Sequence, residues 1–168
     1  MLYIFLGVVL VFLGFYTALY KNYYRWDSPL IKQKYLISHP RVNIFVDQKF
    51  KRIVPEIIGQ IKKNTSKNDY IFIFPNAPMF YFLTERKNPT RYINFAVDLG
   101  LSGREEKVVE DIKKKDVRLI LTHGAPESWR NPLISKYILE NFRKKKEVFE
   151  FTLWEIDESE RRSAVRKI

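Results

Sequence analysis

Asp69-Tyr70-Ile71-Phe72-Ile73-Phe74-Pro75 is the stretch that decides the fold class of this chain. Its five inner positions are all apolar or aromatic, and turn-forming residues flank them on both sides. A short run of this kind is typical of a strand that is covered on both faces, as in a parallel sheet. We therefore interpret Tyr70–Phe74 as a central strand.

Helical patterns lie on both sides of this strand. Isoleucines recur at helical spacing before it and predict an amphipathic helix over 49–64, with Pro55 moving the expected start towards Val54. Asn76 and Pro78 predict the cap and first turn of a short helix that reaches Thr84. Further expected elements are a strand at 92–95, a loop at 100–103, a helix at 105–115, a strand at 117–122, a helix from Asn131-Pro132 to about 144 and a closing strand at 148–156.

Strands and helices thus alternate along the chain. Alternation of this kind predicts a mainly parallel sheet with helices packed on its faces. The expected fold class is a small α/β sandwich, with the closing strand antiparallel at an edge.

Residues 1–20 contain no charged side chain, so all 30 Lys and Arg and all 19 Asp and Glu follow them. A helix of this length spans the hydrocarbon core of a bilayer, and Tyr20 and Trp26 fall where such a helix would meet water. The pattern predicts a transmembrane helix. A cleaved signal peptide is the alternative, although no basic residue precedes the run and no small-x-small site follows it.

Composition divides the rest of the chain into three parts. Residues 21–40 are expected to be a juxtamembrane connector with at most a short helix around 31–37. A soluble domain is expected at 41–156, with a first short strand at 42–46, and a charged tail at 157–168.

The net charge of +11 belongs wholly to the part after residue 20. An excess of this size favours anionic lipid headgroups or phosphate-bearing ligands. Nucleic acid is not an expected partner, because no nucleic-acid-binding motif accompanies the basic residues. The absence of cysteine excludes disulfides and thiolate chemistry. The glycine spacing fits neither a dinucleotide fingerprint nor a P-loop, so no cofactor is predicted.

Two loops follow predicted buried strands and are candidates for a binding site. They are 75–78, with Asn76, and 123–131, with His123; both lead into a helix whose backbone donors could hold a phosphate or sugar oxygen. Arg86, Arg91 and Arg130 are nearby counter-charges. The alternative is that the two asparagines merely start helices. His123 lacks a partner pattern for a nucleophile or a metal, so no catalytic or metal-binding residue is predicted.

The stretch 64–95 reads NTSKNDYIFIFPNAPMFYFLTERKNPTRYINF. It resembles the C-terminal soluble domain of polytopic membrane glycosyltransferases that use polyprenyl-phosphate-linked sugars, the dolichyl-phosphate-mannose mannosyltransferase-like and aminoarabinose-transferase-like proteins. Residues 117–142 resemble a later strand, loop and helix of that family. The residues that fit the first pattern are Thr65, Asp69, Pro75, Pro78, Tyr81, Phe82, Leu83, Arg86, Pro89, Thr90 and Arg91.

The resemblance implies the last transmembrane helix and soluble domain of such an enzyme, as a fragment or a separately encoded part. It implies an extracytoplasmic domain at the cell membrane, whereas Lys21 and Arg25 taken alone would favour the cytoplasm. Expected partners are membrane lipid, a polyprenyl-phosphate-sugar donor or acceptor, and the enzyme's other helices. The family's catalytic carboxylate lies among helices that this chain lacks, so an accessory or acceptor-binding role is expected.

The expected ligand-binding residues are Asn76, Tyr81, Arg86, Arg91 and His123. A different class of function stays open beside this one. In that alternative, the chain is a single-pass protein whose basic domain binds an anionic lipid or a protein partner.

Overall fold

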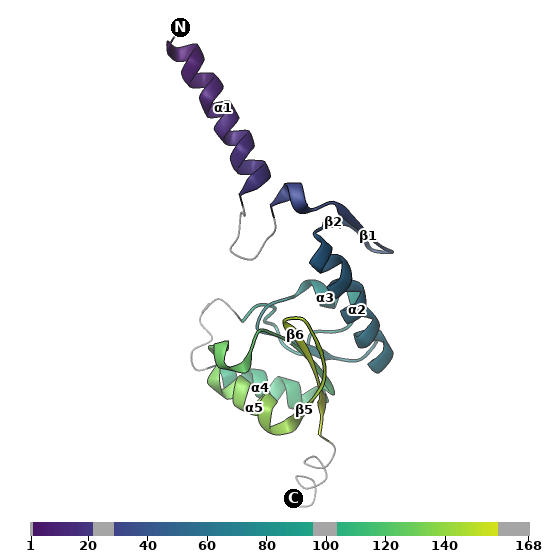
Figure 1. Ribbon diagram of the computed structural model, residues 1–168. Coiled ribbons are helices and arrows are strands. Elements are labelled where there is room, and N and C mark those ends of the chain that lie inside the picture. Colours follow the sequence, from purple (N-terminus) through teal and green to yellow (C-terminus); the bar gives the residue numbers. More distant parts are fainter. Residues whose placement is uncertain (1, 22–28, 96–103, 158–168) are drawn as a thin grey trace, which may run out of the picture. The chain divides into compact units, whose positions relative to one another are not determined.

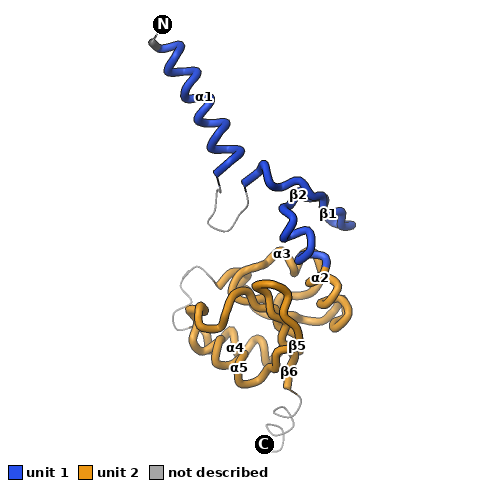
Figure 2. The backbone as a smooth tube through the Cα atoms, in the orientation of Figure 1, with its two compact units in different colours: residues 1–55 blue, residues 56–168 orange. Residues whose placement is uncertain are grey.

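The computed structural model describes residues 2–21, 29–95 and 104–157. The chain forms two compact units, 1–55 and 56–168, and the division falls inside one helix (Figure 2). Figure 1 labels the elements. Their bounds are α1 Leu2–Tyr20, η1 Leu30–Lys32, β1 Tyr35–His39, β2 Val42–Val46, α2 Gln48–Asn64, β3 Ile71–Phe74, α3 Met79–Thr84, α4 Glu105–Lys114, β4 Leu119–His123, η2 Pro126–Ser128, α5 Pro132–Asn141, β5 Phe142–Val148 and β6 Phe151–Ile156.

The first unit contains the apolar helix α1. Within the described residues, α1 is the one helix that is long and apolar enough to cross a membrane, and none of its span Tyr3–Tyr20 is buried. Large apolar side chains of α1 are exposed, for example Phe12 at 70%. A helix that served as the core of a soluble protein would bury such side chains, because their burial is the main favourable term in folding.

The first unit also contains a β-hairpin where a short helix was expected. Of the short helix expected around 31–37, only the 3-10 helix η1 forms, and residues 35–39 instead form β1, which pairs antiparallel with β2. Side chains alternate along both strands, so every second residue lies on the less exposed face, as the twofold period of a strand requires. The predicted strand at 42–46 is confirmed as β2.

Helix α2 begins earlier than its proline suggested. Asp47 caps it, since its Oδ1 accepts a hydrogen bond of 2.8 Å from the Phe50 N–H. Pro55 therefore lies inside the helix and not in its first turn. The predicted helix over 49–64 is confirmed, whereas the start near Val54 is not.

The second unit is built on a four-stranded sheet with the order β3-β4-β6-β5. The α/β class is confirmed, but the sheet is mixed and not mainly parallel. Only β3 and β4 pair in parallel, while β6 runs antiparallel to both of its neighbours. Strand β3 is buried along its whole length, as predicted, yet it lies at an edge and not at the centre.

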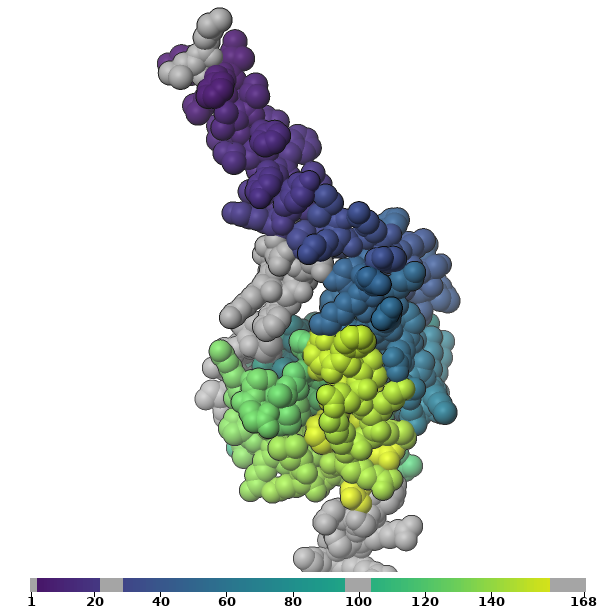
Figure 3. All heavy atoms as spheres, in the orientation of Figure 1, coloured from purple at the N-terminus to yellow at the C-terminus, as the bar shows by residue number. Residues whose placement is uncertain are grey.

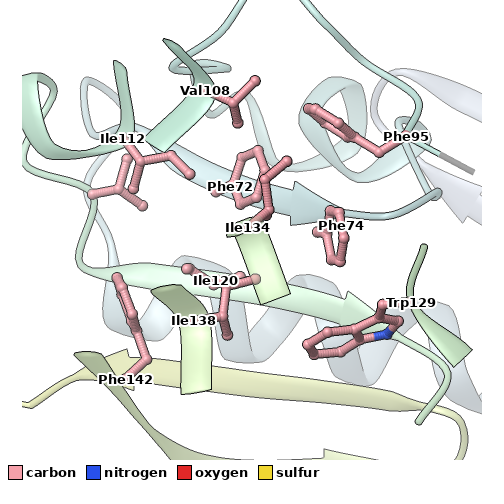
Figure 4. Close-up of a cluster of buried hydrophobic side chains, with 11 residues drawn as sticks. Phe72, Phe74, Phe95, Val108, Ile112, Ile120, Trp129, Ile134, Ile138 and Phe142 are labelled. Carbon is pink, nitrogen blue, oxygen red and sulfur yellow. The ribbon is translucent and has the colours of Figure 1, made fainter. Parts of the chain in front are cut away.

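One face of the sheet packs against α4 and α5. Figure 4 shows the cluster, in which Phe72 of β3 and Ile120 of β4 face Ile112 of α4 and Ile138 of α5. Phe74 and Trp129 meet edge to face, with ring centroids 5.2 Å apart. These side chains are almost wholly buried, so this layer is a hydrophobic core of the unit.

The opposite face packs against α3 and the C-terminal part of α2. Phe80 of α3 contacts Phe151 of β6 edge to face at 5.6 Å. Lys146 of β5 forms an ion pair of 2.8 Å with Glu56 of α2. Both faces of β3 are therefore covered, which explains why its sequence shows no polar alternation.

The C-terminal region differs most from expectation. The helix predicted to reach 144 ends at Asn141, and residues 142–156 form the hairpin β5–β6 where a single strand at 148–156 was expected. The basic run 143–146 hid strand β5, because it reads as a solvated helix end. In the structure, its side chains pair with Glu155, Glu147 and Glu56, and β5 lies at the sheet edge and on the surface (Figure 3).

The remaining predictions concern residues 92–122 and the charged tail. The predicted strand at 92–95 is absent, and only an isolated bridge joins Asn94 to Asn76. The helix at 105–115 and the strand at 117–122 are confirmed as α4 and β4, with small shifts of their ends. The predicted loop at 100–103 and nearly all of the charged tail lie outside the described residues.

Candidate functional site

Asn76 and His123 lie at the carboxyl ends of the parallel strands β3 and β4, as expected. The register pairs Phe74 with Thr122, so the two loops leave the sheet at the same end. Asn76 is exposed and does not cap α3, because Pro78 holds the cap position and no side-chain bond closes it. The predicted capping role of Asn76 is therefore wrong.

His123 is held against the β5–β6 hairpin. Its Nε2 lies 3.9 Å from Glu150 Oε1, and its ring lies 4.7 Å from the ring of Phe151. Its carbonyl accepts a hydrogen bond of 3.2 Å from Trp129 Nε1. The ring and the carbonyl group of His123 are therefore both engaged by other residues of this chain.

The start of α5 is already occupied by a carboxylate of the same chain. Glu105 Oε2, from the first turn of α4, accepts hydrogen bonds from the Leu133 N–H at 2.8 Å and the Ile134 N–H at 3.3 Å. Asn131 makes no side-chain cap bond. The backbone donors that we considered for a phosphate thus bind Glu105, which also ties α4 to α5.

Tyr81 closes the outer edge of the sheet. Its Oη accepts a hydrogen bond of 3.0 Å from the Ile73 N–H of β3 and donates one of 3.3 Å to Asn88 Oδ1. The Lys87 carbonyl accepts from the Ile71 N–H at 3.1 Å. Burial raises the pKa of the Tyr81 hydroxyl far above its ordinary value, which keeps it in the protonated form that donates to Asn88.

Arg86 joins the end of α2 to the end of α3. Its guanidinium donates to Thr65 Oγ1 at 2.8 Å, to the Thr65 carbonyl at 2.7 Å and to the Thr84 carbonyl at 2.6 Å. Thr65 Oγ1 in turn donates to the Ile61 carbonyl at 2.6 Å. Arg86 therefore works inside the fold, and its donors do not point at a free anion.

The residues that follow form a tight turn. Thr90 N–H donates to Asn88 Oδ1 at 3.0 Å, and Asn88 Nδ2 and Thr90 Oγ1 both donate to the Tyr92 carbonyl, at 2.7 and 2.9 Å. Residues 81–92, which include much of the motif that resembles the glycosyltransferase domain, thus run along the outer edge of β3. We call them the β3-edge strip. The turn places Arg91 on the surface beside Tyr92.

Arg91 contributes to a surface pocket of about 360 Å³. Its Nη2 donates to Tyr92 Oη at 2.9 Å, and its guanidinium carbon lies 5.0 Å from the centre of that ring. Arg104, at the start of α4, lines the same pocket, and Arg91 and Arg104 lower the pKa of Tyr92. Lys107 and Asp111 complete the lining of this pocket, which we call the arginine pocket.

The cations of the arginine pocket differ in their partners. Lys107 Nζ lies 2.9 Å from Glu110 and 3.4 Å from Asp111, and the hydrogen bond to Glu110 and the one to Asp111 raise its pKa. Within the described part of the chain, neither Arg91 nor Arg104 forms an ion pair with a carboxylate. Among the described residues, the pocket therefore holds two guanidinium groups that form no ion pair.

The five predicted site residues occupy three separate places. Asn76 and His123 follow the parallel strands, Tyr81 and Arg86 hold segments of the fold together, and Arg91 lies in the arginine pocket. Sequence reasoning missed Tyr92, Arg104, Lys107 and Asp111 as companions of Arg91. Only the contact between α4 and the 88–92 turn brings them together, and no spacing in the sequence signals it.

No protein-family model and no curated protein matches the chain. Among solved structures, the chain is similar to the C-terminal globular domain of an oligosaccharyltransferase from Archaeoglobus fulgidus, with 12% identity and a TM-score of 0.38. The alignment covers 68% of this chain and 100% of that domain. This degree of similarity does not establish a common fold.

Replacing Arg86 with Ala should destabilise the second unit by about 2 kcal/mol or more, because three hydrogen bonds to half-buried acceptors are lost together. Thermal unfolding of the full chain in detergent, followed by near-UV circular dichroism, measures the effect. Lys87→Ala is the control, since the Lys87 side chain is exposed and its bond to Asn68 is long, at 3.4 Å. Equal losses in the two variants would contradict a bridging role for Arg86.

Replacing Glu105 with Ala should cost about 1–2 kcal/mol, the usual range for loss of a helix cap. Glu106→Ala is a closely matched control, because Glu106 lies in the same first turn and is exposed. Hydrogen exchange of the Leu133 and Ile134 amides checks the mechanism directly. Both amides should exchange faster in Glu105→Ala only, and unchanged protection there would rule out the cap.

Proposed function

We propose that this chain is the terminal part of a membrane glycosyltransferase that uses lipid-linked sugar donors, with an accessory or acceptor-binding role. The observation that carries the proposal is the charge-free helix α1, none of whose span is buried, followed in the sequence by a basic α/β domain. Such a helix is stable when lipid surrounds it. Membrane anchoring therefore supplies the first element of the proposal.

The residues that carry the family resemblance support the second element. These residues take part in two sets of hydrogen bonds: Tyr81 and Thr90 act along the β3 edge, and Thr65 and Arg86 join the ends of α2 and α3. The residues that carry the resemblance therefore contribute to the same folded unit. It supports a domain of the glycosyltransferase type, with the donor class following from the resemblance.

The same contacts argue for an accessory role. The Tyr81 hydroxyl and the Arg86 guanidinium are engaged in holding the fold, so they are not available as acid, base or anion ligand. Catalysis would then require the carboxylate that this family carries on other helices. The partners we propose are those helices, membrane lipid, and a polyprenyl-phosphate-sugar donor or its acceptor.

A single-pass basic module that binds an anionic lipid or a protein partner is the second candidate. The unbalanced guanidinium groups of Arg91 and Arg104 favour it, because they offer charge-assisted hydrogen bonds to an anion. In this candidate, removal of the chain leaves sugar transfer unchanged. That difference separates the two functions.

Sugar transfer from a labelled lipid-linked donor, measured in membranes with and without the chain, tests the proposed function. We expect the rate to fall when the chain is absent and to recover when the full chain is restored, while the purified chain alone transfers nothing. An unchanged rate without the chain would favour the second candidate. Transfer by the purified chain would contradict the accessory role.

The location of the domain has its own test, because the natural sequence contains no cysteine. A single cysteine introduced as Lys62→Cys, on the exposed side of α2, reports the side of the membrane through a membrane-impermeant maleimide. We expect labelling in intact cells. Labelling that requires permeabilised cells would place the domain in the cytoplasm and contradict the proposed orientation.

A further inference from the structure

The arginine pocket is the feature that the fold itself leaves unexplained. Arg91 comes from the turn that ends the β3-edge strip, and Arg104 comes from the start of α4, yet both line the pocket beside Tyr92. Two like charges that line one small pocket repel each other, so the arrangement has an electrostatic cost. An anion between them would remove that cost.

Several other cations of the described residues form ion pairs with carboxylates of this chain. Each basic residue of the run 143–146 on β5 pairs with a glutamate of this chain. Lys107 is likewise bound by Glu110 and Asp111. Within the described residues, Arg91 and Arg104 lack such a carboxylate, and both line the same pocket.

The shape and exposure of the arginine pocket suit a small ligand. Its volume of about 360 Å³ lies in the range of small-molecule sites. Arg91 and Arg104 are exposed, so a ligand can reach both. The Tyr92 ring forms one wall and its hydroxyl lies between the guanidinium groups, where it can donate a hydrogen bond to an oxygen of the ligand.

We propose that the arginine pocket binds a phosphoryl group, with the guanidinium groups of Arg91 and Arg104 as bidentate donors and Tyr92 as a third donor. Phosphate matches the fork of the guanidinium group, and two such forks fit a phosphate monoester or diphosphate. Asp111, on the pocket wall, stays bound to Lys107 and does not compete. This inference goes beyond the proposed function, because it holds whichever reaction or partner the domain serves.

Isothermal titration of inorganic diphosphate into the full chain, held in phosphatidylcholine nanodiscs, tests the inference. We expect saturable binding to one site. The double variant Arg91→Gln/Arg104→Gln should weaken binding by at least about tenfold, because each charge-assisted contact contributes roughly a factor of ten. The control Lys62→Gln/Lys63→Gln removes the same charge from exposed positions on α2 and should leave the affinity within about twofold.

A second arm identifies the source of the phosphoryl group. In nanodiscs that contain phosphatidic acid, a pocket that takes a lipid headgroup should bind diphosphate more weakly than in discs with an equal fraction of phosphatidylglycerol. Equal affinities would assign a soluble phosphate compound. Either result supports the site. Absence of saturable diphosphate binding in phosphatidylcholine discs, or equal weakening in the two double variants, would overturn it.

Discussion

The structure of the basic domain depends on how the outer edge of β3 is closed. This strand lies at the end of the sheet, so its outward N–H groups would face the environment without a strand partner. The Lys87 carbonyl and the Tyr81 hydroxyl accept from the Ile71 and Ile73 N–H groups. A strand that is buried on both faces cannot leave such donors unpaired, because each would cost about 1–3 kcal/mol.

Closing this edge has consequences for the surface. The strip that begins at Tyr81 must run back along β3, and the hydrogen bonds of Asn88 and Thr90 then turn it outward. This turn presents Arg91 beside the start of α4, where Arg104 lies. The same segment that completes the sheet thus also contributes Arg91 and Tyr92 to the arginine pocket.

The chain distributes its positive charge unevenly between structural and available cations. The basic run on β5 is neutralised by glutamates and protects an exposed sheet edge, whereas no carboxylate of the described part of the chain pairs with the two arginines of the pocket. A net charge of +11 therefore says less about binding than the location of the cations that lack a partner. Among the described residues, the arginine pocket brings two such cations together.

The apolar periodicity of the chain predicted α2, β3, α4 and β4, because burial of one face or both faces leaves a direct pattern in the residues. The β5–β6 hairpin was not predictable in the same way. Its first strand is mostly charged, and only pairing with β6 and with Glu56 makes an extended conformation favourable there. Of the candidate site residues, Arg91 was selected from the sequence, but its companions were not.

The sequence by itself determined an uncharged helix long enough to span a bilayer, a basic domain and the α/β class, since these follow from local composition and period. Only the tertiary structure decided the strand order, the structural use of Tyr81 and Arg86, and the meeting of Arg91 with Arg104. Those features depend on contacts between segments far apart in the chain. The unpaired N–H groups at the outer edge of β3 require partners from residues that follow later in the chain. No local pattern in the sequence indicates which residues these are.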